Sequence, residues 1–174
     1  MNEIKLPVPY YSQRDNVSEP ERSCNKSSCC MVAEYIKPGV FGGSDNVYSI
    51  LLEGYGDTTN HEAHTRLLSA RGFKTEFRYD LSYEDLDESL FNRKMPVVIG
   101  VLHRGHYLTP YGGHMIVVVG KRETGEYICH DPWGNPFSYD GDNGKDCIIP
   151  RQSLDTRWLA DGDKLGWGRL FYPS

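Results

Sequence analysis

Apolar positions recur at helical spacing through the first half of the chain. One such face starts near Cys24, just after the N-cap candidate Ser23, and the Pro38-Gly39 pair ends it. Its members are Ser28, Met31, Val32, Tyr35 and Ile36. The same spacing, with capping residues and glycines, predicts three more helices over residues 44–53, 60–71 and 82–94. Prolines among the first 23 residues predict an extended, loop-like start.

Runs of β-branched and apolar residues predict strands in the second half of the chain. They cover residues 74–79, 96–102, 114–119, 126–130 and 167–172. The short turn over residues 121–125 makes the third and fourth of these strands a hairpin. Helices followed by antiparallel strands predict an α+β fold, with N-terminal helices packed on an antiparallel sheet. No linker divides the chain, so we expect residues 1–174 to form a single domain.

Composition then narrows the class of protein. A chain of 174 residues with 39% hydrophobic and 25% charged residues is long enough to bury a core, which excludes intrinsic disorder. No apolar run approaches the roughly 20 residues of a spanning helix. The net charge of −5 and the lack of a basic block argue against a nucleic-acid partner. The N-terminus lacks the apolar core of a signal peptide, so we expect a cytoplasmic protein. We also expect a monomer.

Cys24 is the first candidate for chemistry. A cysteine in the first turn of a helix lies at the positive end of the helix dipole, which favours the nucleophilic thiolate. The alternative is a small buried side chain in the core. The chain has five cysteines, and we expect them to be reduced. Cys29 and Cys30 are expected in the core, as is Cys129, whereas Cys147 lies in a polar loop with either an exposed thiol or a pairing.

A nucleophilic cysteine needs a base, and the base needs a group that orients it. His114 opens a strand after two glycines, and Asp131 ends the next strand. If these strands form a hairpin, both side chains lie at the same end, where Asp131 would hold the imidazole in one tautomer. Each residue also has a purely structural interpretation: a satisfied histidine, and an Asp-Pro turn.

Gln13 precedes Cys24 by 11 residues, in the loop that leads to its helix. Its side-chain N–H and the backbone N–H of Cys24 are candidate donors to the oxyanion of a tetrahedral intermediate. A loop glutamine is otherwise solvated.

The residues around these candidates form an ordered set of motifs. Residues 8–13 (VPYYSQ) precede residues 24–36 (CNKSSCCMVAEYI); then come residues 95–101 (MPVVIGV), 112–120 (GGHMIVVVG) and 130–135 (HDPWGN). This order resembles the C39-like, papain-like cysteine peptidases over residues 6 to 135. Asn25-Lys26 departs from the usual Gly-Pro after the cysteine.

The resemblance implies a papain-like fold and roles for four residues. Cys24 would be the nucleophile, His114 the general base and acid, Asp131 the orienting group and Gln13 part of the oxyanion hole, with no cofactor and no metal. Residues 157–172 are similar to the end of phage-borne relatives that act on cell-wall peptides. The sequence therefore predicts a peptidoglycan-degrading endolysin, an endopeptidase or amidase that reaches the wall at host lysis. The alternatives are a double-glycine leader peptidase and a catalytically silent binding or effector module.

Several other motifs were weighed as sites. His61 and His64 are spaced i and i+3, which fails the H-E-x-x-H zinc pattern and predicts a pair on a helix surface. Residues 140–146 place Lys145 where a calcium loop needs glycine, so they predict a turn. Two loop histidines, His103 and His106, either edge the substrate cleft or face solvent. The tryptophans Trp133, Trp158 and Trp167 line a groove for peptide or sugar, or simply pack.

Overall fold

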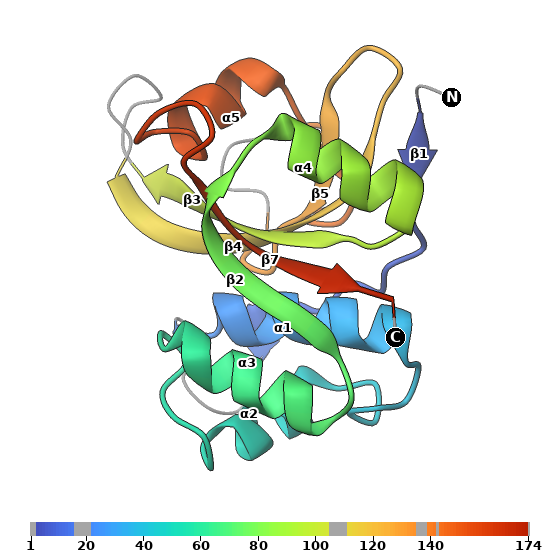
Figure 1. Ribbon diagram of the computed structural model, residues 1–174, viewed down its shortest axis with the longest axis vertical. Coiled ribbons are helices and arrows are strands. Elements are labelled where there is room, and N and C mark those ends of the chain that lie inside the picture. Colours follow the sequence, from blue (N-terminus) through green and yellow to red (C-terminus); the bar gives the residue numbers. More distant parts are fainter. Residues whose placement is uncertain (1–2, 16–21, 105–110, 135–138, 142, 174) are drawn as a thin grey trace.

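The computed structural model describes residues 3–15, 22–104, 111–134, 139–141 and 143–173. A group of helices packs against one antiparallel sheet, which confirms the α+β class. Figure 1 shows α1, α2 and α3 gathered below the sheet, whereas α4 and α5 lie at its upper end. The bounds of the lower helices are Cys24–Ile36 for α1, Asp45–Leu52 for α2 and His61–Ala70 for α3.

Helix α1 is buried along most of its length rather than on one face. Every residue from Asn25 to Glu34 is buried, because α1 lies between the sheet and the other two lower helices. Its polar side chains therefore need partners. Ser27 donates to Asp45 at 2.7 Å, and the Glu34 carboxylate accepts backbone N–H bonds from the turn after the helix. The turn follows Pro38, where the sequence predicted the helix to end.

The remaining helical segments cover the ends of strands. A short helix, α4 (Tyr83–Asp87), continues as π-helical turns over Glu88–Arg93, so the predicted helix at 82–94 exists with an altered second half. Lys94 ends it in the left-handed conformation. Helix α5 (Arg151–Arg157) was not predicted, since only Leu154 and Arg157 are buried and seven residues give little periodicity.

The strands form one sheet in the order β2-β7-β3-β4-β5-β6, with β1 paired to β4, and every pairing is antiparallel. Its members are β1 (Ile4–Lys5), β2 (Lys74–Leu81), β3 (Val97–Arg104), β4 (Tyr111–Lys121), β5 (Tyr127–His130), β6 (Cys147–Ile149) and β7 (Gly166–Tyr172). The predicted hairpin is β4–β5, with Val117 opposite His130. Asp131 therefore leaves the sheet at the end where β4 begins.

Two short strands were missed, and one of them reverses a prediction. β1 replaces part of the loop-like start, and it passes so close to β4 that a Cβ on Gly120 would meet the backbone of Ile4. β6 pairs with β5, placing Cys147 opposite Cys129. Cys147 is consequently buried, and the prediction of a polar loop was wrong. Cys29, Cys30 and Cys129 are buried as predicted.

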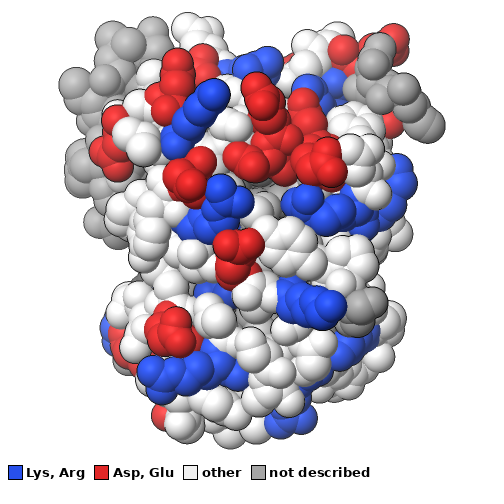
Figure 2. All heavy atoms as spheres, in the orientation of Figure 1, with Lys and Arg blue, Asp and Glu red and all other residues white. Residues whose placement is uncertain are grey.

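The acidic residues are unevenly distributed over the surface. In Figure 2, Asp and Glu gather in the upper half of the face shown, the half where Figure 1 places α4. Glu84, Asp85 and Glu88 belong to this segment. Among the described residues, no helix is both long and apolar enough to cross a membrane.

Candidate active site

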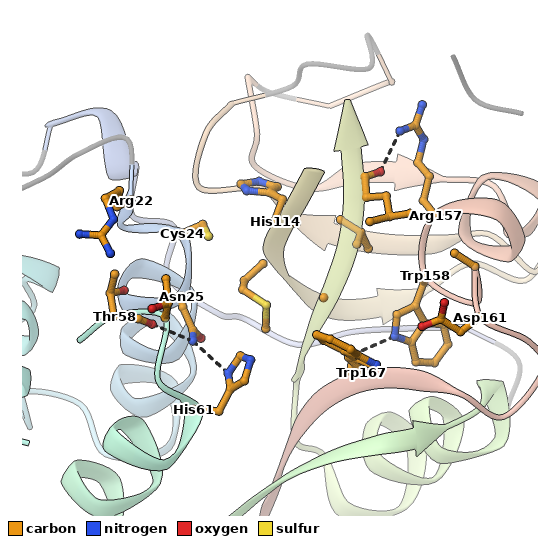
Figure 3. Close-up of a pocket in the computed structure, with 17 residues that line it drawn as sticks. Arg22, Cys24, Asn25, Thr58, His61, His114, Arg157, Trp158, Asp161 and Trp167 are labelled. Atoms are coloured by element: carbon orange, nitrogen blue, oxygen red, sulfur yellow. Dashed lines mark hydrogen bonds between the residues drawn. The ribbon is translucent and has the colours of Figure 1, made fainter. Parts of the chain in front are cut away.

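The candidate residues come from the two layers of the fold and meet at their boundary. Cys24 is the first residue of α1, His114 lies near the start of β4, and Asp131 directly follows β5. In Figure 3 the Cys24 sulfur points towards the His114 ring. Cys24 is partly buried, and both His114 and Asp131 are buried. The hairpin thus brings together two residues that the sequence predicted to share one end.

His114 and Asp131 are joined by a short hydrogen bond. His114 Nε2 lies 2.6 Å from Asp131 Oδ1, which also accepts the backbone N–H of Trp133 at 3.0 Å. Since Nε2 is engaged by the carboxylate, Nδ1 is the ring nitrogen left for a second partner.

That second partner is Cys24, which with Asp131 is one of the two groups whose interactions with the ring raise the pKa of His114. Burial alone lowers the pKa of His114, but the hydrogen bonds and charges of Asp131 and Cys24 outweigh it and raise the pKa to about 10. The imidazole is therefore cationic at neutral pH.

The backbone of Asp131 is fixed from two sides. Its N–H donates to the carbonyl of Gly144 at 2.7 Å, and its own carbonyl accepts the Tyr10 hydroxyl at 2.8 Å. Gly144 has a φ of +105°, and a Cβ there would meet both Tyr10 and the carbonyl of Asp131. Only glycine fits this position, which adjoins the carboxylate that holds His114.

Gln13 lies on the Asp131 side of the site. It begins a short 3₁₀ turn, Gln13–Asp15, and its backbone N–H donates to the carbonyl of Pro132 at 2.8 Å. Its side chain is buried, so the alternative of a solvated loop glutamine is wrong. The sequence signal for this residue was its place in the VPYYSQ motif rather than any periodicity.

One hydrogen bond ties the two layers together beside the site. The Ser28 hydroxyl, one turn along α1 from Cys24, donates to the carbonyl of Met115 at 3.1 Å. Met115 directly follows His114 on β4. The bond therefore fixes the helix that begins at Cys24 relative to the strand that carries His114.

The two residues that depart from the family pattern are buried and bonded. Asn25 Nδ2 lies 3.3 Å from the Thr58 carbonyl and 3.3 Å from His61 Nδ1, and Lys26 donates to Ser49 at 2.9 Å. In place of Gly-Pro, this chain thus has side chains that join the start of α1 to α2 and α3.

A cavity of about 330 Å³ opens beside Cys24 and His114. Cys24 and Asn25 line it from α1, and His114 and Met115 from β4. Trp158 and Trp167 line it at a distance from the cysteine (Figure 3). Two of the three weighed tryptophans therefore belong to the cavity, whereas Trp133 packs under the Arg14 guanidinium at 4.4 Å.

The histidine pair His61 and His64 is engaged within the protein. His64 is fully buried, between the Tyr48 hydroxyl at 2.7 Å and the Thr58 carbonyl at 2.8 Å, so its predicted place on a helix surface was wrong. His61 stacks on Phe77 with ring centroids 3.7 Å apart. Among the described residues there is no cluster of three or more groups suited to a metal ion.

His106 and Asp142, the latter within the 140–146 turn, lie outside the described residues, as does the side chain of His103.

Comparisons with known proteins identify the family and the fold. The model of the Peptidase_C39 like family matches residues 5–164. A putative C39-like peptidase from Bacillus anthracis superposes with a TM-score of 0.69 at 16% identity, covering 100% of this chain and 99% of that one. A double glycine motif protease from an AMS/PCAT transporter, solved with its leader peptide, gives 0.60 at 18%, covering 98% and 94%.

A plant cysteine protease has a similar fold. The cysteine protease of Carica candamarcensis in complex with E-64 gives a TM-score of 0.51 at 12% identity, covering 100% of this chain and 99% of that one. The predicted papain-like fold is thus confirmed. No curated protein matches the chain significantly.

Proposed function

Because this chain belongs to the Peptidase_C39 like family, we propose that it is a cysteine peptidase with Cys24 as nucleophile, His114 as general base and acid, and Asp131 as the orienting group. The observation that carries the proposal is the chain of contacts in which His114 bridges Asp131, 2.6 Å away, and the Cys24 side chain. These contacts support the proposal because a nucleophilic thiol needs a base beside it and a group that orients the base.

The proposed reaction has two stages. The Cys24 thiolate attacks the amide carbonyl carbon, the C–N bond breaks, and the imidazolium of His114 gives its proton to the leaving amine. Water then attacks the thioester while His114 accepts its proton, which releases a carboxylic acid and restores the thiolate. Gln13 and the backbone N–H of Cys24 are the proposed donors to both oxyanions.

We propose the peptide part of peptidoglycan as the substrate, which makes the protein an endolysin-type wall hydrolase acting as one domain over residues 1–174. Its support is the resemblance of residues 157–172 to phage-borne wall hydrolases. The second candidate is a leader-peptide processing peptidase, which the likeness to the double glycine motif protease favours.

Two substrates separate these candidates. Purified protein is incubated with peptidoglycan sacculi and, separately, with a peptide that contains a double-glycine leader site. A wall hydrolase releases new amines from sacculi, and mass spectrometry of the digest identifies the bond. Cleavage of the leader peptide alone would replace the wall substrate by the second candidate, and Cys24→Ala serves as the blank for both.

A catalytically silent module is distinguished by the reactivity of Cys24. Iodoacetamide at pH 6 alkylates a thiolate rapidly and an ordinary thiol slowly. We expect rapid, stoichiometric labelling that is lost in Cys24→Ala, with the buried Cys29 and Cys30 unlabelled in the native protein. Slow labelling of Cys24 together with no cleavage of any peptide would refute the peptidase proposal.

A further inference from the structure

The part of the cavity away from Cys24 combines indole rings with a carboxylate. Trp158, Asp161 and Trp167 line it together (Figure 3). Trp158 is buried and its Nε1 donates to the carbonyl of Trp167 at 3.0 Å, which fixes its position. Trp167 is 44% exposed, so part of its ring is open to a ligand. Asp161 is exposed in the turn between α5 and β7.

Asp161 contributes a negative charge that its surroundings do not neutralise. Within the described part of the chain, it has neither an ion pair nor a hydrogen bond, and it is the single carboxylate that lines this cavity. The turn that carries it is held by the Gly162 N–H, which donates to the Leu159 carbonyl at 3.0 Å. A positioned carboxylate at the wall of an apolar cavity attracts a cation.

The cationic side chains of the same cavity are directed elsewhere. Arg22 is bound to Asp57 at 2.8 Å. Arg157 donates to the Leu102 carbonyl at 2.8 Å, and Figure 3 shows its guanidinium directed away from Asp161. Burial, with the charge of Arg169, lowers the pKa of His61 to about 4, so His61 is neutral at pH 7. The two arginines thus have partners other than Asp161, and His61 carries no charge that would pair with it.

We propose that this end of the cavity is a subsite for a cationic side chain of the substrate, a primary amine or guanidinium on an aliphatic stem. The stem packs against the indoles, and the cation pairs with Asp161 over the face of Trp167. The inference rests on the proposed peptidase function. It assigns Asp161 as a specificity-determining residue, although the chemistry takes place at Cys24.

The first test compares matched peptides. A quenched fluorescent library, in which lysine or its uncharged isostere norleucine occupies each position near the scissile bond, gives kcat/KM for each pair. We expect lysine to be preferred at one position by about three- to tenfold at low salt, falling as salt is raised. Asp161→Asn should abolish this preference by lowering kcat/KM for the lysine peptide to about that of the norleucine peptide. Asp163→Asn is the control, because Asp163 is exposed two residues away and does not line the cavity.

A second test does not need catalysis. In the Cys24→Ala protein, the tryptophan fluorescence, to which the partly exposed Trp167 contributes, is titrated with acetyl-lysine amide and acetyl-norleucine amide, with and without Asp161→Asn. Tighter binding of the lysine compound, lost in Asp161→Asn, supports the subsite even if no peptide is cleaved. Cleavage without a lysine preference, or equal binding of the two compounds, overturns the subsite and leaves the peptidase proposal standing.

Discussion

His114 and Asp131 lie 17 residues apart in the chain, yet their Nε2 and Oδ1 atoms are 2.6 Å apart and both side chains are buried. Water screens such a pair poorly, so the carboxylate helps to raise the pKa of His114. Removal of the carboxylate would leave a buried imidazole without its orienting partner.

We expect Asp131→Ala to lower kcat/KM by about 10²- to 10⁴-fold, because the imidazole loses its fixed tautomer. Asp131→Asn should be milder, since the amide oxygen still accepts the Nε2–H, but it removes the charge that raises the pKa of His114. The raised pKa of His114 predicts an alkaline limb of the pH profile near pH 10, and Asp131→Asn should move this limb to lower pH. An unchanged limb in Asp131→Asn would contradict this role for the carboxylate.

Two cysteine substitutions should separate catalysis from packing. Cys24→Ala should abolish turnover and change the free energy of unfolding by less than about 1 kcal/mol, because its side chain is only partly buried. Cys30→Ala removes a fully buried sulfur and should cost about 1–2 kcal/mol while preserving activity per folded molecule. Urea unfolding measures the free energy of unfolding, and active-site titration measures the activity per folded molecule. Residual turnover in Cys24→Ala would reject Cys24 as the nucleophile.

Gly144 should affect activity although it bears no functional group. Gly144→Ala places a methyl group against Tyr10 and the Asp131 carbonyl, and displacement of Asp131 should lower kcat/KM by about tenfold or more. Gly125→Ala is the matched control, with a φ of +97° beside the +105° of Gly144 but open space around it. Both substitutions should lower the free energy of unfolding by about 1–2 kcal/mol, because alanine is strained at a positive φ. Equal activities in the two variants would show that Asp131 tolerates the displacement.

His64 should make the fold sensitive to acid. Burial lowers its pKa to about 3 from the ordinary 6.5, so below pH 6.5 the unfolded chain binds a proton that the folded chain does not. The free energy of unfolding should therefore decrease as the pH is lowered from about 6.5 to 3. This residue should contribute up to about 1.4 kcal/mol per pH unit to the decrease. His64→Gln should lower stability at pH 7 but flatten this slope in urea unfolding series. A slope equal to that of the native protein would place the acid sensitivity elsewhere.

The sequence predicted most of what positions the site. The Cys24 helix begins and ends where its cap, its apolar spacing and Pro38 indicated, and the β4–β5 hairpin follows from two β-branched runs with a short turn. Both elements are determined by residues close together in the sequence, which is the range over which hydrophobic periodicity and turn residues are informative. The pairing of His114 with Asp131 then followed from the hairpin alone.

The features that were missed depend on contacts distant in sequence. Nothing local indicates that Cys147 joins a strand opposite Cys129, or that Ile4 pairs with Lys121. The burial of His64 likewise requires Tyr48 and Thr58 from other segments. Asp161 and Trp167 line the same cavity because α5 and β7 both lie at the edge of the site. The sequence of such short elements does not predict where in the fold they lie.

The bond from Ser28 to Met115 has a consequence for how this protein loses activity. It joins α1 to β4 one turn after Cys24 and one residue after His114. Without this bond, α1 and β4 each keep their own backbone hydrogen bonds. A shift of α1 relative to β4 would therefore separate Cys24 from His114 and abolish activity, while circular dichroism would still report native secondary structure. Heating should accordingly inactivate the protein at a lower temperature than it melts, and Ser28→Ala should widen that interval.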